Sequence, residues 1–218
     1  MPKEAEGVIM CDVCPKAECQ RRYPDGVPSY CLANKFDDVI EETKALYISP
    51  EVINIYKASG QVVTKGYRKW PRIQEALEFA RELGVKKVGI ASCIGLRTEA
   101  KDIAELFKGA GFTVVCASCQ IGAVGPVERG LGQEYADFQG LYCNPITQAE
   151  IMNREGTELN YVVGLCLGHD ILFNRFSKAP ASTLIVKDRV TGNNPEAALY
   201  SSFHRDTLWK TYCPKKKG

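Results

Sequence analysis

Four of the ten cysteines in this 218-residue chain lie within 21 residues of one another near the N-terminus. Cys11 and Cys14 form a Cys-x-x-Cys pair, which lets two thiolates reach one metal or cluster from a single tight turn. Pro15 follows directly, and proline after a cluster cysteine is typical of ferredoxin-type runs. The segment is rich in proline, lacks an apolar period and cannot bury a core without a staple. It therefore predicts a metal site whose ligands are Cys11, Cys14, Cys19 and Cys31.

Two alternatives are open for the identity of the metal at this N-terminal site. Structural zinc sites are usually built from two cysteine pairs, and only one such pair is present here. The irregular two–four–eleven spacing suits an iron–sulfur cluster at least as well. We expect an iron–sulfur cluster of the [4Fe-4S] type, with zinc as the alternative.

A second group of cysteines follows apolar segments that have the pattern of β-strands. These segments end in Ala-Ser-Cys93, Ala-Ser-Cys119 and Gly-Leu-Cys166, and a glycine follows each cysteine after two or three residues. The carboxyl ends of parallel strands share one edge of a sheet, where open α/β proteins bind their ligands. Glycines there allow tight turns and close approach to a ligand. We expect Cys93, Cys119 and Cys166 to share one cofactor-binding site.

Two further residues are candidates for chemistry at this edge. Cys143 lies in a loop just before a predicted helix, as a fourth ligand or a nucleophile. His169 follows Cys166 and Gly168, and histidine serves as a ligand or an acid–base group. Three thiolates on a four-iron cluster would leave one iron open to act as a Lewis acid on a small molecule. The chain would then be an enzyme with Cys143 and His169 in its catalytic site.

Other interpretations of these thiols remain open. Cysteine is often simply a buried apolar residue, and we expect this of Cys116, which lies inside its strand. A non-catalytic metal carrier or sensor would use the same ligands without a reaction. Sulfur transfer through Cys93 or Cys119 would use thiol chemistry without a metal.

The elements that must position these residues alternate between strands and helices after residue 85. Near-continuous apolar strands between amphipathic helices indicate a parallel sheet covered on both faces. We predict an α/β fold in which a parallel sheet of about four strands is flanked by helices. A cysteine-rich metal-binding module (1–34) precedes an α/β domain (35–218), which has a helical lead-in (35–84) and its sheet within 85–205. The predicted strands are 87–92, 112–117, 160–165 and 183–187, and the helices are 35–48, 51–58, 71–84, 98–110, 146–154, 171–176 and 195–201.

Composition excludes several classes of protein. The net charge is +2, with 28 basic and 26 acidic residues, which gives no argument for a nucleic acid or a membrane surface as partner. No stretch approaches the roughly 18 apolar residues of a membrane span, and the polar N-terminus does not resemble a signal peptide. We expect a cytoplasmic protein, in which cysteines serve as metal ligands or reactive thiols rather than disulfides. No dinucleotide or P-loop motif occurs, so nucleotide use has no motif support. The expected partners are a small-molecule ligand at the sheet edge or a redox partner protein.

Several motifs along the chain resemble those of one protein family. They are Cys-Asp-x-Cys at 11–14, Ala-Ser-Cys at 91–93, Tyr-Cys-Asn-Pro-Ile at 142–146, Val-Gly-Leu-Cys-Leu-Gly-His-Asp-x-Leu-Phe at 163–173 and Lys-Ala-Pro-Ala-Ser-Thr-Leu-Ile-Val-Lys-Asp-Arg-Val at 178–190. Together they resemble an uncharacterised, cysteine-rich domain-of-unknown-function family of anaerobic bacteria and archaea, whose members are labelled as metal-binding proteins. The resemblance covers nearly the whole chain. It implies metal binding and an anaerobic setting, which favours iron–sulfur clusters over zinc, and it implies no particular reaction.

Overall fold

A computed structural model describes residues 11–12, 14, 17–135 and 141–213 of the chain. The chain forms two compact units, Met1–Gly60 and Gln61–Gly218. The functional division after residue 34, which the cysteine-rich composition suggests, stays a prediction. Within the described residues, no helix is long and apolar enough to cross a membrane.

The first unit is helical in its described part. A 3-10 helix (Glu18–Arg21) and α1 (Leu32–Lys35) precede α2 (Asp37–Tyr47) and the longer α3 (Pro50–Gly66), which continues past the end of the unit. The rings of Tyr47 and Tyr56 lie 5.1 Å apart and join α2 to α3. The predicted helix 51–58 is only part of α3, which is longer than expected. A glycine inside a helix costs only about 1 kcal/mol and need not end it.

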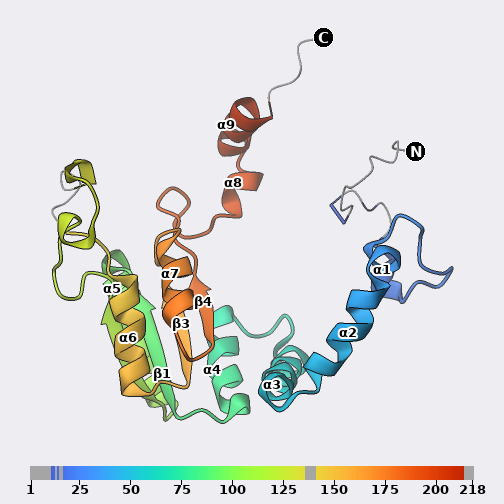
Figure 1. The fold of residues 1–218 in the computed structure, drawn as a ribbon, viewed down its shortest axis with the longest axis horizontal. Coiled ribbons are helices and arrows are strands. Elements are labelled where there is room, and N and C mark those ends of the chain that lie inside the picture. The colour runs from blue at the N-terminus through green and yellow to red at the C-terminus, as the bar shows by residue number, and fades with distance from the viewer. Residues whose placement is uncertain (1–10, 13, 15–16, 136–140, 214–218) are drawn as a thin grey trace. The chain divides into compact units, whose positions relative to one another are not determined.

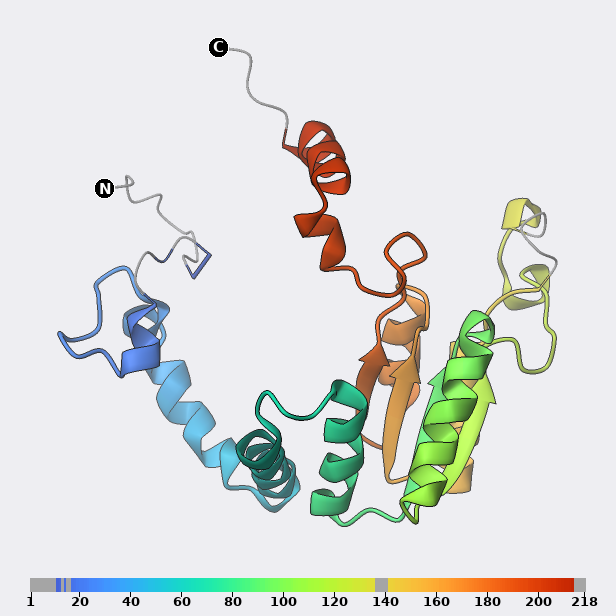
Figure 2. The ribbon, with the colours of Figure 1, turned by 180° about the vertical axis from the view of Figure 1, so that it is seen from behind.

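The second unit contains a four-stranded parallel sheet in the order β2-β1-β3-β4 (Figures 1 and 2). In chain order its strands are β1 (Lys87–Ser92), β2 (Thr113–Ser118), β3 (Leu159–Val163) and β4 (Ala181–Ile185). At the carboxyl end of β1, Ser92 is paired with Ser118 of β2 and with Val163 of β3. Three strands therefore end at the same level, and the predicted α/β fold is confirmed.

Helices cover both faces of this sheet. On one face α4 (Arg72–Leu83) and α5 (Arg97–Gly109) pack on the strands, as Figure 2 shows, and the rings of Phe107 and Tyr161 lie 5.2 Å apart in that core. On the other face α6 (Pro145–Glu155) and α7 (His169–Phe176) contribute Met152 and Phe173 to a second buried cluster. Successive strand residues alternate between the two cores, as the pleat requires.

Shorter elements complete the unit. A 3-10 turn (Ile94–Leu96) leads from β1 into α5, and two more (Val127–Arg129 and Gln133–Tyr135) lie between β2 and α6. After β4 come α8 (Ala197–Tyr200), which matches the predicted helix 195–201, and α9 (Ser202–Tyr212), where the sequence around His204 has the pattern of a terminal helix. The expectation that Cys116 is buried is wrong, because it lies on the edge strand β2 and is exposed.

The close contact of β1 with β3 and α6 generates a stability prediction. A Cβ on Gly89 would lie 2.1 Å from Asn160 Oδ1 and 2.6 Å from Met152 Sδ, so Gly89→Ala should lower the free energy of unfolding by about 1–3 kcal/mol through overpacking. The control is Gly109→Ala in α5, where a Cβ meets nothing within 4 Å and stability should rise by up to about 1 kcal/mol. Urea denaturation measures both, and equal losses in the two variants would contradict the packing argument.

Candidate metal centre

The cysteines that follow the strands are brought together by the sheet's own hydrogen bonds. Cys93 donates its N–H to the Val163 carbonyl (3.0 Å), and Cys119 donates its N–H to the Ser92 carbonyl (2.8 Å). Each ladder therefore continues one residue past the strand and holds a cysteine at the edge. Cys143 arrives from the loop before α6, and the next residue, Asn144, donates its N–H to the Cys119 carbonyl (2.6 Å).

A left-handed turn brings the fourth cysteine back to this edge. Gly164, directly after β3, has φ +63° and donates its N–H to the Ile185 carbonyl of β4 (2.8 Å). A Cβ at this position would lie 2.1 Å from Leu96 Cδ1, so only glycine fits both the backbone and the space. Cys166 follows two residues later at the same edge.

The four sulfurs form a closed group that we call the thiol ring (Cys93, Cys119, Cys143 and Cys166). The Sγ atoms of Cys119 and Cys143 are 3.5 Å apart. Cys166 lies within hydrogen-bonding reach of both Cys143 and Cys93, and Cys93 lies within reach of Cys119. Each sulfur thus has two sulfur neighbours. Two members, Cys93 and Cys119, are buried, while Cys143 and Cys166 are half-buried.

His169 adjoins the ring at the first residue of α7. One donor atom each from Cys143, Cys166 and His169 lie within 4.8 Å of one another, a spacing that suits a bound metal ion. Nδ1 of His169 is buried and has no hydrogen-bond partner among the described residues. The imidazole edge faces Tyr142, with ring centroids 5.7 Å apart. His169 thus lies close enough to two ring sulfurs to act either as a ligand beside them or as a hydrogen-bond donor to them.

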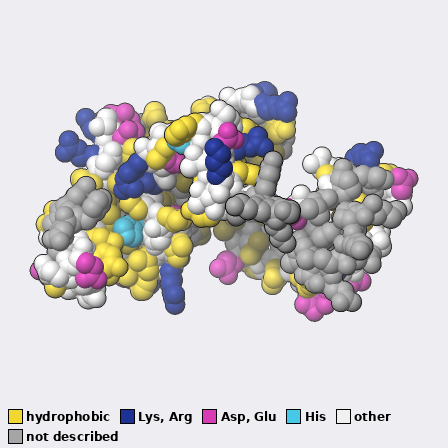
Figure 3. All heavy atoms as spheres, turned by 90° about the horizontal axis from the view of Figure 1, so that it is seen from above, with side chains coloured by type: hydrophobic (Ala, Val, Ile, Leu, Met, Phe, Trp, Pro, Cys, Tyr) yellow, Lys and Arg dark blue, Asp and Glu magenta, His cyan; other side chains and the backbone are white. Residues whose placement is uncertain are grey.

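Two cations from the loop after β4 face the same sulfurs. Arg189 donates from Nη2 to Cys166 Sγ (3.2 Å), and the Lys187 ammonium lies within hydrogen-bonding reach of Cys93. The backbone N–H of Ile94 donates to Cys119 Sγ (3.3 Å). Seen from the side to which the strands point, Lys and Arg side chains lie among hydrophobic ones on this face (Figure 3). Three of the four sulfurs therefore have a cation or an N–H group to stabilise their negative charge.

The pKa values of the four thiols alternate between lowered and raised around the ring. Hydrogen bonds from Cys143 and then Cys93 hold the pKa of Cys119 at about 3, and the same two neighbours, with His169, lower the pKa of Cys166. The pKa values of Cys93 and Cys143 are raised, because each is hydrogen-bonded to these thiolates and both are desolvated. Thiols with raised and lowered pKa values thus alternate around the ring, since adjacent thiolates repel one another. The Cys166 thiolate also raises the pKa of His169.

The four N-terminal cysteines belong to the other unit. Cys11 and Cys19 are exposed, and Cys14 and Cys31 are half-buried. Cys31 Sγ lies 3.4 Å from the Tyr23 hydroxyl, and this contact, with the negative charges of nearby cysteines, raises the pKa of Tyr23 to about 12. The group of donor atoms within 4.8 Å does not include these cysteines, so their metal site stays a prediction.

The structure therefore brings together all five residues predicted for the sheet edge: Cys93, Cys119, Cys143, Cys166 and His169. Sequence reasoning missed Lys187 and Arg189. The signal that could have found them is their place at the end of the fourth predicted strand and just after it, because that end reaches the same edge of the sheet. No disulfide joins any of the ten cysteines, all of which lie in the described residues.

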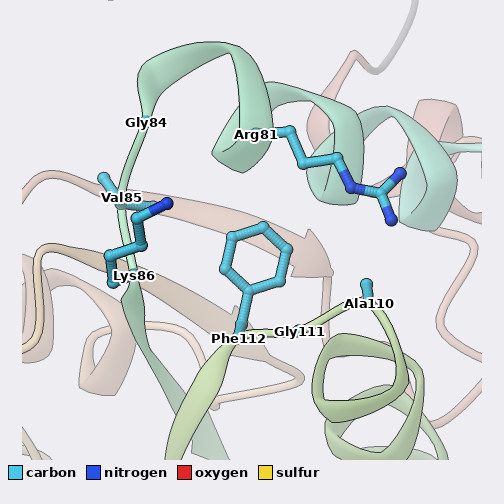
Figure 4. A pocket seen from close by; sticks show the side chains of 7 residues that line it. All are labelled: Arg81, Gly84, Val85, Lys86, Ala110, Gly111 and Phe112. Atoms are coloured by element: carbon cyan, nitrogen blue, oxygen red, sulfur yellow. The ribbon is translucent and has the colours of Figure 1, made fainter.

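A shallow pocket of about 140 Å³ lies at the opposite edge of the sheet (Figure 4). Its lining comes from the turns that precede β1 and β2, and includes Arg81, Lys86 and Phe112. The side chains of its lining offer neither a thiol, a histidine nor a carboxylate. The pocket thus lacks the chemistry that the carboxyl edge has.

Comparison with known proteins places the chain in a family. Residues 31–184 match the family described as "Protein of unknown function (DUF1847)". The chain belongs to this family. An uncharacterized protein of the archaeon Methanocaldococcus jannaschii, MJ0455, is 38% identical over 185 residues, which cover 82% of this chain and 90% of that protein. The predicted resemblance to a family of unknown function is thus confirmed.

The region matched to DUF1847 contains one cysteine group completely and the other only in part. It contains the whole thiol ring, His169 and Cys31, whereas Cys11, Cys14 and Cys19 precede it. Lys187 and Arg189 follow the matched residues closely. Neither the family description nor the archaeal protein's name gives a ligand or a reaction. The chemistry of this DUF1847 protein has to be argued from its residues.

The alternating acidities generate a prediction for thiol labelling. In reduced, metal-free protein at about pH 5.5, Cys166 should react with iodoacetamide at least about tenfold faster than Cys116, because only the thiolate is nucleophilic and partial burial of its sulfur raises the pKa of Cys116. Peptide mass spectrometry after brief labelling measures the ratio. Arg189→Ala should reduce it by removing a donor to Cys166. Faster labelling of Cys116 at this pH would refute the assignment.

Proposed function

We propose that this protein binds a metal ion through the four thiolates of the thiol ring. The observation that supports this most is the convergence of four sulfurs from four separate segments at the edge where α/β sheets bind ligands. Four neighbouring thiols that cannot all ionise alone become compatible when a divalent cation lies between them. The cysteine-rich composition agrees with a metal-binding protein.

The charges around the ring suit a metal–thiolate complex. A divalent ion with four thiolates carries a net charge of −2, which must be offset where the sulfurs are buried. Arg189, Lys187 and His169 lie against the sulfurs and supply this offset as hydrogen-bond donors. We assign His169 to this outer layer of donors and Cys143 to the ligands. Three cysteines on a four-iron cluster would leave one iron open to a small molecule. Because four thiolates bind the metal in this proposal, it includes no open iron.

One sulfur–sulfur distance in the ring has the spacing of two ligands on a single ion. Two thiolates on a tetrahedral zinc with Zn–S bonds of about 2.3 Å are about 3.8 Å apart, close to the 3.5 Å between Cys119 and Cys143. The donor atoms that all lie within 4.8 Å of one another are those of Cys143, Cys166 and His169, so binding one ion through all four thiolates would also draw Cys93 and Cys119 inward. A four-iron cluster would require the sulfurs to move apart, because each thiolate binds a different iron. We therefore propose zinc at the ring.

We propose the iron–sulfur cluster for the N-terminal cysteines instead. Its support is the spacing of Cys11, Cys14, Cys19 and Cys31, with a single Cys-x-x-Cys pair followed by proline. Among the described residues no disulfide joins these cysteines, which suits a reducing cytoplasm, and we propose this compartment. A small molecule or a redox partner protein would approach the ring at the sheet edge.

The test is to measure metal and acid-labile sulfide in protein purified without oxygen, with each cysteine group removed in turn. The variant Cys119→Ser/Cys166→Ser should lose one zinc per chain and keep its iron and sulfide. The variant Cys11→Ser/Cys14→Ser should lose iron and sulfide and keep its zinc. Cys116→Ser is the matched control, because Cys116 is exposed and outside both groups, and it should change neither content.

Each outcome of these metal measurements is decisive for one site. If the wild-type protein loses no metal when Cys119 and Cys166 are replaced by serine, the proposal for the ring is refuted. Iron and sulfide lost with the ring cysteines would mean that the ring holds the cluster and that its sulfurs move apart from the 3.5 Å spacing on binding.

The raised pKa values of two ring thiols generate a pH prediction. Cys93 and Cys143 must lose their protons when the ion binds, and lowering the pH favours the protonated, metal-free state. The affinity for Cd²⁺, followed by its thiolate charge-transfer absorption, should fall by about 100-fold per pH unit because two protons are released. A slope of about tenfold or less would mean that one thiol at most is protonated before binding.

A further inference from the structure

A buried amide on α6 lies directly beneath the thiol ring. Gln148 is fully buried, and its Nε2 donates to two backbone carbonyls, Ala117 O (2.7 Å) and Ser92 O (3.1 Å). These carbonyls come from neighbouring strands, β2 and β1. Ser92 directly precedes Cys93, and Ala117 lies two residues before Cys119. The amide therefore bonds to the two strand ends that carry the buried half of the ring.

The same residue is tied to the third cysteine of the ring. Its backbone N–H donates to the Asn144 carbonyl (3.1 Å), and Asn144 directly follows Cys143. Asn144 in turn donates its N–H to the Cys119 carbonyl. Gln148 thus connects the start of α6, where Cys143 lies, with the ends of β1 and β2.

The orientation of the amide is fixed by these bonds. Both hydrogens of Nε2 are used, whereas the buried Oε1 has no hydrogen-bond partner among the described residues. The reversed amide would place Oε1 against two carbonyl oxygens and repel both. The site therefore uses the two donors and leaves the acceptor unsatisfied, which a residue needed only to fill space would not do.

We propose that Gln148 is a positioning residue of the metal centre, which holds the backbones of Cys93, Cys119 and Cys143 together at the sheet edge. This inference rests on the proposed metal-binding function of the thiol ring. Gln148 acts through the carbonyls of Ser92 and Ala117, to which its side chain is bonded, rather than as a ligand. Groups that orient ligands in this way typically change metal affinity by about 10–100-fold when they are removed.

The test uses full-length protein in which the four N-terminal cysteines are serine, so that Co²⁺ reports on the ring. Gln148→Met keeps the volume and removes both donors, and Gln148→Glu replaces the donors by a carboxylate that faces two carbonyls. The Co²⁺ dissociation constant should rise about 10–100-fold in Gln148→Met, and the ligand-field bands should shift because the thiolate geometry relaxes. Gln148→Glu should have the larger effect.

The matched control is Asn153→Ala on the same helix. Asn153 donates its side-chain N–H to the Phe176 carbonyl (2.9 Å) and so joins α6 to α7, away from the ring. Its loss should lower the thermal stability of the metal-free protein without changing the Co²⁺ spectrum or affinity. This comparison separates a general weakening of α6 from the loss of ligand positioning.

The outcomes distinguish this inference from the proposed function. If the parent protein binds Co²⁺ and Gln148→Met has the parent's spectrum and affinity, Gln148 is only structural and the inference is overturned. If the parent binds no Co²⁺, the proposed function itself fails, and the inference fails with it. If Gln148→Glu does not fold, Gln148→Met alone decides, since an apolar residue of equal volume is compatible with the buried site.

Discussion

The parallel register of β2, β1 and β3 is the constraint on which the rest of the site depends. Because Ser92 is paired with both Ser118 and Val163, the three strands end at one level. Cys93 and Cys119 then follow without any intervening residue and remain in the ladder through their own N–H groups. A slip of one residue would move a cysteine to the other face of the sheet, where α4 and α5 pack, because side chains alternate along a strand. The position of the sulfurs is thus a consequence of the pairing.

Crowding four sulfurs at this edge creates an electrostatic problem that the surrounding residues only partly solve. A buried charge is costly unless it is paired, and four thiolates in mutual contact repel one another. Arg189, Lys187 and the Ile94 N–H each stabilise one sulfur, yet two thiols still retain their protons. The arrangement therefore favours a divalent cation over an anion at its centre, since the cation replaces two protons and relieves the repulsion.

Much of the fold could be predicted from the sequence, because the strands are near-continuous apolar runs with glycine-rich ends. Each of the four strands lies within two residues of its predicted position, and the cysteines at their ends meet as expected. The place of Lys187 and Arg189 at the end of the fourth predicted strand indicates the same edge, but their contacts with the sulfurs could not be predicted, because the direction of a loop side chain depends on contacts distant in sequence. The exposure of Cys116 could not be predicted either, because the strand order decides which strand lies at the edge, and no local pattern reports that order. The N-terminal site rests on spacing alone.

The two cysteine groups differ in how folding and metal binding depend on each other. The N-terminal cysteines are close in sequence, and their segment has no core, so a metal there would contribute directly to the stability of the folded segment. The ring cysteines span residues 93 to 166 and meet only after the sheet has formed. Phe107, Tyr161 and the apolar faces of four helices stabilise that sheet without a metal. In the proposed metal site at the ring, the fold would therefore bring the ligands together before an ion binds.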